Sequence, residues 1–535
     1  MPDRLGIGRW IALFGLAALT LLIGLGGPSA PRLSYHEALV AQGAREMWAR
    51  GDLITPTIAG LPWIEKPPLA HWLTLAGSRL AGRVDEWTTR LPSALAAVVV
   101  VVAVALLAAR HHGGHVGLIA GLVQATTYWT VQRGRLGDAD IQLTAIITAA
   151  LVVFDALRSL GSERSYRTRA LVVLFFTLLG MSAWAKGIVF GSVIIGVVVC
   201  STLLAERDWA TARRLLSPSG WAWTALLTLA WPAAVIATHP QALGLWTLHI
   251  SDRLAERSAN FAGGPWWSYL AAMLGLVLPW TPFAWVSILR AFRSGPRRAD
   301  SFDRFLAIWA FAPLVLLSFA TVKNAHYAIH ALPPFSIWAA RSVARLLERL
   351  EAAKWSPRAL RIAGVGSFAI LGTIYAVMNC LIIPRYESRG SEVRFLERIG
   401  PGLPAASTLV LLHDDWDRLP YRTPFGPVPH DLALRLFALD RPDVEVRTVF
   451  TPASLESSVG DLSTFTVLAR SRDLPALDAL GTTTLVFPGP TDRWDRTFDL
   501  YRVSRSTRPA LRELREDREI SLPCDRDGVE AGRTW

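Results

Sequence analysis

Apolar runs of about 20 residues recur along most of this 535-residue chain. A helix of that length crosses about 30 Å of hydrocarbon, which is the apolar thickness of a bilayer. Only 18% of the residues are charged, whereas an average soluble domain has about 25%. The chain is therefore predicted to be an α-helical polytopic membrane protein.

The runs predict eleven transmembrane spans: 11–27, 91–109, 116–132, 141–157, 170–184, 187–205, 221–238, 267–289, 305–322, 325–340 and 362–383. With the N-terminus in the cytoplasm, the inner loops hold 21 basic residues and the four short outer loops hold six. Basic residues favour cytoplasmic loops, so this bias predicts a cytoplasmic N-terminus and an extracytoplasmic C-terminus in the cytoplasmic (inner) membrane. The net charge of +12 follows from these loops, so membrane lipids are expected partners and nucleic acid is not.

Two domains are predicted, a membrane domain over residues 1–383 and a separate extracytoplasmic domain over 384–535. The first outer loop of the membrane domain, 28–90, is long and carries two amphipathic helix signals. One helix is expected over Tyr35–Arg50, stopped by Gly51. A second is expected to start at Pro67-Pro68 and run toward Gly82, because proline suits a first helical turn. Both are expected to lie along the membrane surface.

The pattern of the C-terminal domain changes to short β-like runs at 407–412, 464–469 and 482–487, with an amphipathic segment at 429–439. Alternating short strands and helices predict a small α/β domain. The charged tail after about residue 503 is expected to be loosely ordered.

The unusual polar residues of the membrane domain gather in its outer loops, at the level of lipid headgroups. They are His36, Glu37, Glu65, Lys66, Arg133, Arg135, Asp138, Asp140, Lys186, His249, Asp252, Arg253, Glu256, Arg257, Lys323, His326 and Tyr327. A secondary transporter is expected instead to carry ionisable groups near the membrane midplane, with broken helices and internal repeats. A lysine or a divalent metal neutralises a phosphate leaving group, and a carboxylate deprotonates an acceptor hydroxyl. The set favours a reaction on a lipid-linked phosphate.

Each of these residues also has an ordinary structural explanation. Glu65 and Lys66 alone are a loop ion pair, and Asp140 is well placed to cap the following helix. Lys186 satisfies a short turn, while His249 and Lys323 suit an interface with the headgroups. The hypothesis of a reaction site depends on the whole set.

Five stretches resemble successive landmarks of one family. They are "SYHEALVAQGAREMWARGDLITPTIAGLPWIEKPPLAHWL" (34–73), "RLGDADIQLTAII" (135–147), "WAKGIVFG" (184–191), "HISDR…GGPWWSYL…LPWTPF" (249–283) and "KNAHYAIHALPPFSIWAA" (323–340). In this order they resemble the GT-C membrane glycosyltransferases related to bacterial aminoarabinose transferase and protein O-mannosyltransferase. The resemblance covers about residues 1–345 and does not reach the C-terminal domain.

The resemblance implies inverting transfer of a sugar from a polyprenyl-phosphate carrier to an envelope acceptor, on the outer face of the membrane. By position, Glu65 and His249 correspond to ligands of a divalent metal, with zinc, magnesium and manganese all open. Lys66 corresponds to a contact with the donor phosphate, Lys186 and Tyr327 to further positions on the donor side, and Lys323 to a less firmly matched one. Asp140 corresponds to the carboxylate of the second outer loop.

One position departs from the family. The family has Asp-Glu at the start of the first loop helix, with an arginine three residues after the Asp, and that Asp is its presumed catalytic carboxylate. Here the pair is His36-Glu37, and Leu39 stands at the arginine position. Either His36 or Glu37 acts as the base, the acceptor needs no strong base, or this branch has changed its chemistry.

Two other function classes remain open at this point, a transporter or flippase of a lipid-linked saccharide and a non-catalytic relative that binds envelope glycans. A flippase moves the donor without consuming it, and a binding protein does neither. The donor sugar, the acceptor and the oligomeric state are not determined by the sequence.

Overall fold

The computed structural model describes residues 25–26, 31–160, 165–247, 265–294, 300–320, 323–386, 389–412, 421–423, 426–428, 432–449, 451–489 and 498–505. The chain divides into two compact units. The first comprises Met1–Pro401 and Asp415–Arg441, and the second comprises Gly402–Asp414 and Pro442–Trp535. The domain limits predicted at residues 383 and 384 stay a prediction.

The two helices predicted in the first outer loop are confirmed. Helix α2 covers Tyr35–Arg50 and ends at Gly51, whose φ of 67° is the left-handed conformation that glycine adopts readily. A two-residue hairpin of β1 (Thr57–Ile58) and β2 (Leu61–Pro62) follows, and then α3 (Leu69–Ala81) begins directly after the double proline. Capping residues and prolines close in sequence therefore determine where these helices begin and end.

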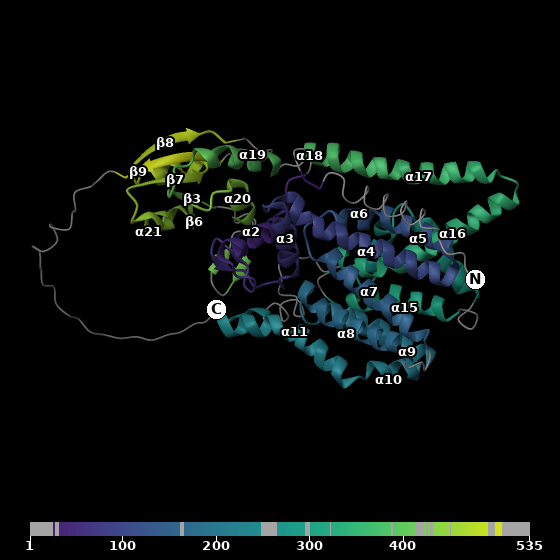
Figure 1. The fold of residues 1–535 in the computed structure, drawn as a ribbon. Coiled ribbons are helices and arrows are strands. Elements are labelled where there is room, and N and C mark those ends of the chain that lie inside the picture. Colours follow the sequence, from purple (N-terminus) through teal and green to yellow (C-terminus); the bar gives the residue numbers. More distant parts are fainter. Residues whose placement is uncertain are drawn as a thin grey trace, which may run out of the picture. The chain divides into compact units, whose positions relative to one another are not determined.

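The protein is a multi-pass membrane protein, and the described residues include six helices long and apolar enough to span a bilayer. They are α4 (Glu86–His112), α7 (Asp140–Arg158), α8 (Tyr166–Lys186), α11 (Pro218–Thr238), α15 (Ser301–Ser318), and α17 (Pro357–Val377) with its π-helical continuation η2 (Met378–Ile382). In α7, 83% of the apolar stretch is buried, so this helix lies inside the bundle. In α17 the share is 0%, and the helix runs along one side of the unit (Figure 1).

The count of eleven spans stays a prediction, since the first of them, 11–27, lies almost wholly outside the described residues. The other described segments of the first unit are shorter or less apolar. They are α5 (Gly114–Thr126), α6 (Tyr128–Gly134), α9 (Phe190–Glu206), α10 (Trp209–Leu215), α13 (Ser268–Leu276), α14 (Thr281–Ser294), η1 (Ala325–Ala331), α16 (Leu332–Ala352), α18 (Ile383–Tyr386), α19 (Arg389–Ile399), η3 (Gly400–Gly402), β4 (Tyr421–Thr423), β5 (Gly426–Val428) and α20 (Leu432–Leu439).

Two spans predicted as continuous helices are interrupted, which corrects the sequence-based limits. The run 116–132 breaks between α5 and α6, and the run 267–289 breaks between α13 and α14, where Pro279 has no amide to donate. Polar groups at one break form hydrogen bonds with polar groups at the other. The Tyr128 amide donates to the Leu278 carbonyl at 2.8 Å, and the Trp280 indole donates to the Thr126 hydroxyl at 3.0 Å. Backbone groups left open in an apolar environment need such partners.

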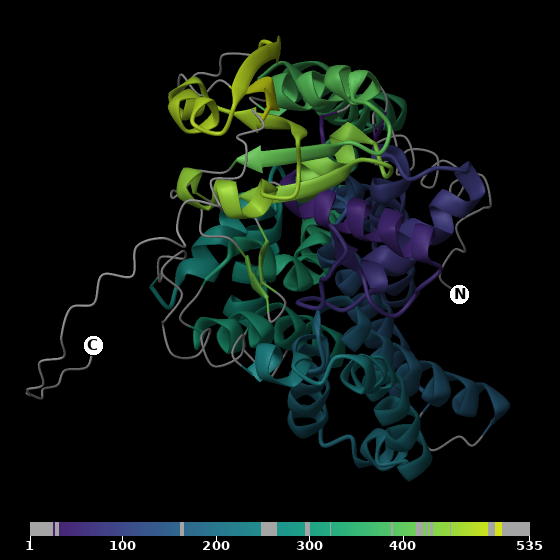
Figure 2. The ribbon, with the colours of Figure 1, turned by 90° about the vertical axis from the view of Figure 1, so that its left-hand side faces the viewer.

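The second unit contains a five-stranded mixed sheet in the order β6-β3-β7-β9-β8. Its strands are labelled in Figure 1 and are seen as green to yellow arrows from a second side in Figure 2. Its strands are β3 (Thr408–Leu412), β6 (Glu445–Val449), β7 (Thr464–Ala469), β8 (Thr482–Phe487) and β9 (Asp499–Ser504). Short helical segments connect them: η4 (Pro452–Ser454), α21 (Leu455–Val459), η5 (Ser471–Asp473) and α22 (Leu474–Asp478). All of β3 is buried, as expected of a central strand flanked by two parallel neighbours. The predicted small α/β region is confirmed.

Candidate active site

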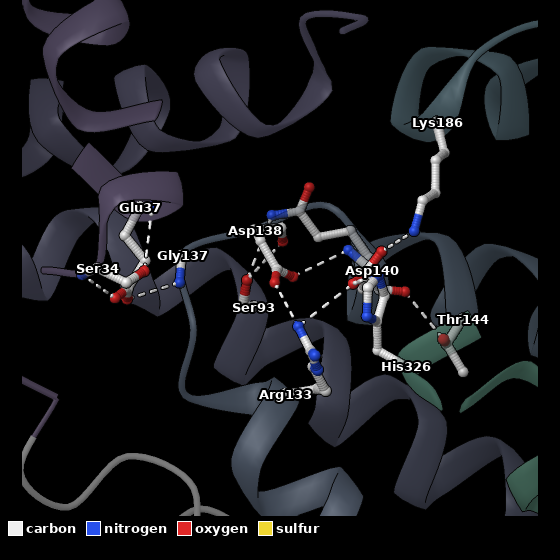
Figure 3. Close-up of polar contacts among 11 residues, drawn as sticks. Ser34, Glu37, Ser93, Arg133, Gly137, Asp138, Asp140, Thr144, Lys186 and His326 are labelled. Carbon is white, nitrogen blue, oxygen red and sulfur yellow. Dashed lines mark hydrogen bonds and ion pairs between the residues drawn. The ribbon is translucent and has the colours of Figure 1, made fainter. Parts of the chain in front are cut away.

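The carboxylate of Glu37 connects three parts of the chain, and Figure 3 shows its contacts with Ser34 and Gly137. It accepts the Ser34 amide at 2.8 Å, which closes the capping box of α2, and it accepts Nε of Arg90 in α4 at 2.7 Å. It also accepts the Gly137 amide at 3.0 Å, in the loop between α6 and α7. Burial raises the pKa of Glu37, but the Arg90 charge and these hydrogen bonds outweigh burial and hold the pKa below its usual range. Glu37 is therefore an ionised residue that positions this loop.

The loop itself leaves little room for movement. A Cβ atom at Gly137 would lie 2.6 Å from Cγ2 of Thr89, so this position accommodates only glycine without a shift. The Ser93 hydroxyl of α4 donates to the backbone carbonyl of Asp138 at 3.0 Å. Glu37 of α2 thus binds the backbone before Asp138, and Ser93 of α4 binds the backbone carbonyl of Asp138 itself.

Asp140 begins α7 and lies at the centre of a charged cluster (Figure 3). Its Oδ1 accepts Nζ of Lys186, which ends α8. Its Oδ2 accepts Nη1 of Arg133 at 3.4 Å and lies 3.7 Å from Nε2 of His326. A carboxylate held by two cations remains an anion, and it fixes the lysine in turn.

Asp138 shares this arginine but has a different environment. Its Oδ2 accepts Nη1 of Arg133 at 3.1 Å, and its Oδ1 accepts the backbone amide of Asp140 at 3.0 Å. Burial raises the pKa of the Asp138 carboxyl, and the charge of Asp140 raises it further, while Arg133 and Lys186 oppose this only in part.

Aromatic rings surround the lysine of the cluster. Nζ of Lys186 lies 4.3 Å from the ring centre of Tyr327 and 5.3 Å from that of Phe190, within the range of cation–π attraction. The His326 ring packs on Tyr327 with centres 4.4 Å apart. The charges of Asp140, Lys186, Arg133 and Lys66 all act on the His326 ring. Lys66 therefore lies close enough to the cluster to act on it.

Three tryptophans hold the loop that carries Glu65 and Lys66. Each indole donates to a backbone carbonyl of the first outer loop: Trp72 to Leu53 at 2.6 Å, Trp231 to Ile54 at 2.9 Å, and Trp246 to Ile64 at 2.8 Å. The last of these carbonyls directly precedes Glu65. The position of the Glu-Lys pair is thus set from α3, from α11 and from the segment that follows α11.

The remaining predicted site residues lie elsewhere or outside the described part of the chain. His36 is exposed on the first turn of α2. Lys323 donates to the Ala320 carbonyl at 2.8 Å. His249 lies outside the described residues, so its pairing with Glu65 stays a prediction. Among the described residues no group of three His, Cys, Asp or Glu side chains has the arrangement of a metal site. Glu65 by itself is therefore an incomplete ligand set for a divalent metal.

The structure brings Asp140, Lys186 and Tyr327 together, and their geometry depends on four further residues to which the sequence assigned no individual task. These are Arg90, Arg133, Asp138 and Trp246. Arg133 and Asp138 were visible as charges in the same outer loop as Asp140, whereas Arg90 and Trp246 lie in or beside apolar runs and had no local signal. The cluster as a whole presents an ionised acid, a second acid of raised pKa and two cations beside aromatic rings. Such a site is suited to bind an anionic group and to exchange a proton beside it.

Comparison with known proteins shows relatives of this chain in sequence and in fold. A sequence model of the dolichyl-phosphate-mannose-protein mannosyltransferase family matches residues 65–165. The undecaprenyl phosphate-α-4-amino-4-deoxy-L-arabinose arabinosyl transferase of Edwardsiella ictaluri is 28% identical over 385 residues, which is 70% of this chain and 66% of that protein. The enzyme of the same name from Serratia proteamaculans is 25% identical over 340 residues, which is 62% of this chain and 58% of that protein. The chain thus spans somewhat less than two thirds of the length of these curated relatives.

Solved structures show the same fold. The crystal structure of ArnT from Cupriavidus metallidurans bound to undecaprenyl phosphate superposes with a TM-score of 0.70 at 19% identity, covering 92% of this chain and 98% of that one. The Archaeoglobus fulgidus oligosaccharyltransferase in the apo form gives a TM-score of 0.53 at 11% identity, covering 94% of this chain and 75% of the other. At these identities the likeness establishes the fold.

Proposed function

We propose that this chain is a GT-C membrane glycosyltransferase of the aminoarabinose transferase type and that it transfers a sugar from a polyprenyl-phosphate carrier to an acceptor of the cell envelope; the matching family model, the curated relatives and the shared fold support this. The observation that supports this most is the contact of Lys186 with both Asp140 and Tyr327. It places a fixed cation among polar groups that the sequence assigns to the outer ends of the membrane helices, where the phosphate of a lipid-linked donor lies.

The proposed reaction needs a cation where charge develops on the leaving group. When the bond between the anomeric carbon and the phosphate oxygen breaks, the electron pair stays with the phosphate. Lys186 stabilises this charge from the cluster, and Lys66, which acts electrostatically on His326, stabilises it from the first outer loop. A preorganised contact of this kind contributes about 10²–10³-fold to the rate.

For the sugar we propose a pentose of the 4-amino-4-deoxy-arabinose type, because the two curated relatives described above are named for it. The matching family model, named for mannose transfer, makes a hexose the first alternative to test. We also propose that the site faces the outside of the cytoplasmic membrane, with the N-terminus in the cytoplasm, on the 21-to-6 distribution of basic residues. A C-terminal reporter active only in the cytoplasm contradicts this orientation.

A divalent metal remains part of the proposal, with Glu65 and His249 as its ligands, and bound it would supply further positive charge at the phosphate. Nothing in the transfer step above depends on it. Metal analysis of the purified protein tests it directly. Stoichiometric zinc, magnesium or manganese that is lost in a Glu65→Gln variant supports the site, and an equal content in that variant excludes it.

The experiment that tests the function uses purified protein in lipid nanodiscs with two radiolabelled donors, undecaprenyl phosphate-linked 4-amino-4-deoxy-arabinose and undecaprenyl phosphate-linked mannose. Envelope membranes supply the acceptor, and the readouts are labelled product and released undecaprenyl phosphate. Replacing Lys186 or Lys66 by Met keeps most of the side chain and removes the charge, so transfer is expected to fall about 10²–10³-fold. Lys323→Met is the matched control. Lys323 donates to the nearby Ala320 carbonyl, so its replacement is expected to reduce transfer less.

The interrupted helix pairs α5/α6 and α13/α14 favour a second candidate, since broken helices are typical of secondary transporters. At these breaks, however, the contacts made by the described residues join backbone, hydroxyl and indole groups, and none of these contacts involves a charged side chain. The same nanodisc material, reconstituted in vesicles, separates the candidates. Movement of the intact labelled donor across the bilayer without release of undecaprenyl phosphate identifies a flippase, and neither movement nor release identifies a binding protein.

A further inference from the structure

Asp138 and Asp140 share one guanidinium nitrogen, yet their surroundings differ. Nη1 of Arg133 lies 3.1 Å from Oδ2 of Asp138 and 3.4 Å from Oδ2 of Asp140. Asp140 has the Lys186 ammonium as a second cation in direct contact, and its side chain is 10% exposed. Among the described residues, the one cation in direct contact with Asp138 is the arginine, and the Asp138 side chain is 20% exposed. The two carboxyl groups therefore have different electrostatic environments within one cluster.

The charged groups that face Asp138 come from three helices. Arg133 belongs to α6, Asp140 to α7, and Lys186 to α8. The neighbouring anion and burial favour the protonated form of Asp138, whereas the two cations favour its anion. When the environments of two neighbouring carboxyl groups separate their pKa values in this way, one stays ionised and the other exchanges protons near neutral pH.

Helix capping does not explain a carboxylate at position 138. Oδ1 of Asp138 accepts the Asp140 amide two residues on, which is an Asx turn that an asparagine makes equally well. The backbone around it is already held by Glu37 at the Gly137 amide and by Ser93 at the Asp138 carbonyl. The carboxyl group itself is held by Nη1 of Arg133 and by the Asp140 amide, so it is preorganised within the cluster.

Glu37, one of the residues expected to act as a base, has a different task in this structure. Its carboxylate is bound by Arg90 and by two backbone amides, and its pKa is lowered. A base of lowered pKa accepts a proton weakly at neutral pH. Asp138 is the nearby carboxyl group whose pKa is shifted toward neutrality.

We propose that Asp138 is the general base of the transfer and that the acceptor therefore presents a neutral hydroxyl group. The inference rests on the proposed function and specifies the class of its acceptor. In the step, the acceptor oxygen attacks the anomeric carbon and forms the new C–O bond. The bond from that carbon to the phosphate oxygen breaks, and its electron pair leaves with the polyprenyl phosphate beside Lys186. The proton of the acceptor hydroxyl passes to the Asp138 carboxylate and then to solvent.

The first test is the pH profile of Asp138→Asn, measured as single-turnover release of undecaprenyl phosphate from the two labelled donors with envelope membranes present. Asparagine keeps the Asx turn, so the variant is expected to fold and to bind undecaprenyl phosphate like the wild type. The rate at pH 8 is expected to fall about 10²–10⁴-fold, the usual contribution of a general base. In the wild type the rate falls as the pH drops and Asp138 becomes protonated, and in the variant this fall disappears.

The second test separates a base from a structural residue. Azide is an anionic nucleophile that needs no deprotonation, so it is expected to restore donor consumption in Asp138→Ala and to give a glycosyl azide. It is not expected to restore Lys186→Met, in which the leaving group has lost its cation. Correct folding of each variant is checked by its elution as a monodisperse peak and by its binding of undecaprenyl phosphate.

Different outcomes contradict the role of Asp138 as the base and the proposed transfer reaction. If the wild type consumes donor and Asp138→Asn consumes it at the same rate with the same pH profile, the inference is overturned. That result points to an acceptor that is itself an anion. If azide does not restore donor consumption in a correctly folded Asp138→Ala variant, this also counts against Asp138 as the general base. Wild-type protein that consumes neither donor overturns the proposed function and the inference together.

Discussion

Removing the arginine that pairs with Glu37 tests how this site is held together. Arg90 and Glu37 are 4% and 2% exposed, with Nε and Oε1 2.7 Å apart. In Arg90→Met the Glu37 charge stays buried without its cation, and removing one partner of a buried pair costs about 3–5 kcal/mol in the free energy of unfolding. Arg32 provides the matched control, because its pairs with Glu86 and Glu397 are partly exposed. Such pairs contribute about 0–1 kcal/mol.

The assay is reversible unfolding of the purified protein in mixed micelles with increasing SDS, followed by tryptophan fluorescence. The double variant Arg90→Met with Glu37→Met completes the cycle. It is expected to be about 0.5–3 kcal/mol more stable than the sum of the single changes, because it leaves no unpaired buried charge. It remains less stable than the wild type, since the Ser34 and Gly137 amides lose their acceptor. If Arg90→Met costs no more than Arg32→Met, the buried pair does not hold the loop and the reasoning is refuted.

Two further outcomes are expected. The pKa of Glu37 is lowered on folding, so its contribution to stability is complete above the pKa of the unfolded chain and is lost as the pH falls through the folded value. Stability is therefore expected to decrease below about pH 4, and Glu37→Gln should show a shallower decrease in the same SDS titration. Replacing Trp246 by Phe removes its hydrogen bond to the carbonyl before Glu65, so transfer is expected to fall about 2–12-fold with undecaprenyl phosphate binding weakened in parallel. Trp223→Phe, which removes an exposed indole contact to a threonine hydroxyl, is the control, and equal losses in both variants contradict a positioning role for Trp246.

Much of the local structure was predictable because its signals lie within a few residues of each other. The first outer-loop helix begins after the Ser34 cap and ends at Gly51, as its pattern indicates. The strands at 464–469 and 482–487 have the predicted limits. The six described helices of spanning length coincide with predicted spans, because length and apolar composition alone decide whether a helix suits a bilayer.

The candidate site was predictable only in part. Asp140 and Lys186 were both expected at the outer boundary, and in the structure the two side chains are in contact. Their distinct tasks were not predictable, because the protonation of a carboxyl group depends on the charges and the burial around it. Asp138 and Asp140 are two residues apart in sequence and have similar local surroundings, and contacts from distant segments, Lys186 of α8 and His326, distinguish them.

Residue types and their spacing were thus sufficient to establish that the chain crosses a membrane, where its loop helices begin and end, and which side chains gather at one boundary. The tertiary structure decided which of those side chains meet, that Glu37 is bound by Arg90 from 53 positions away, and that two apolar runs are broken where Tyr128 meets Leu278. The physical reason is the range of the interactions. Caps, turns and apolar stretches depend on neighbours along the chain, whereas the state of a buried charge or an open backbone amide depends on the segments that pack against it.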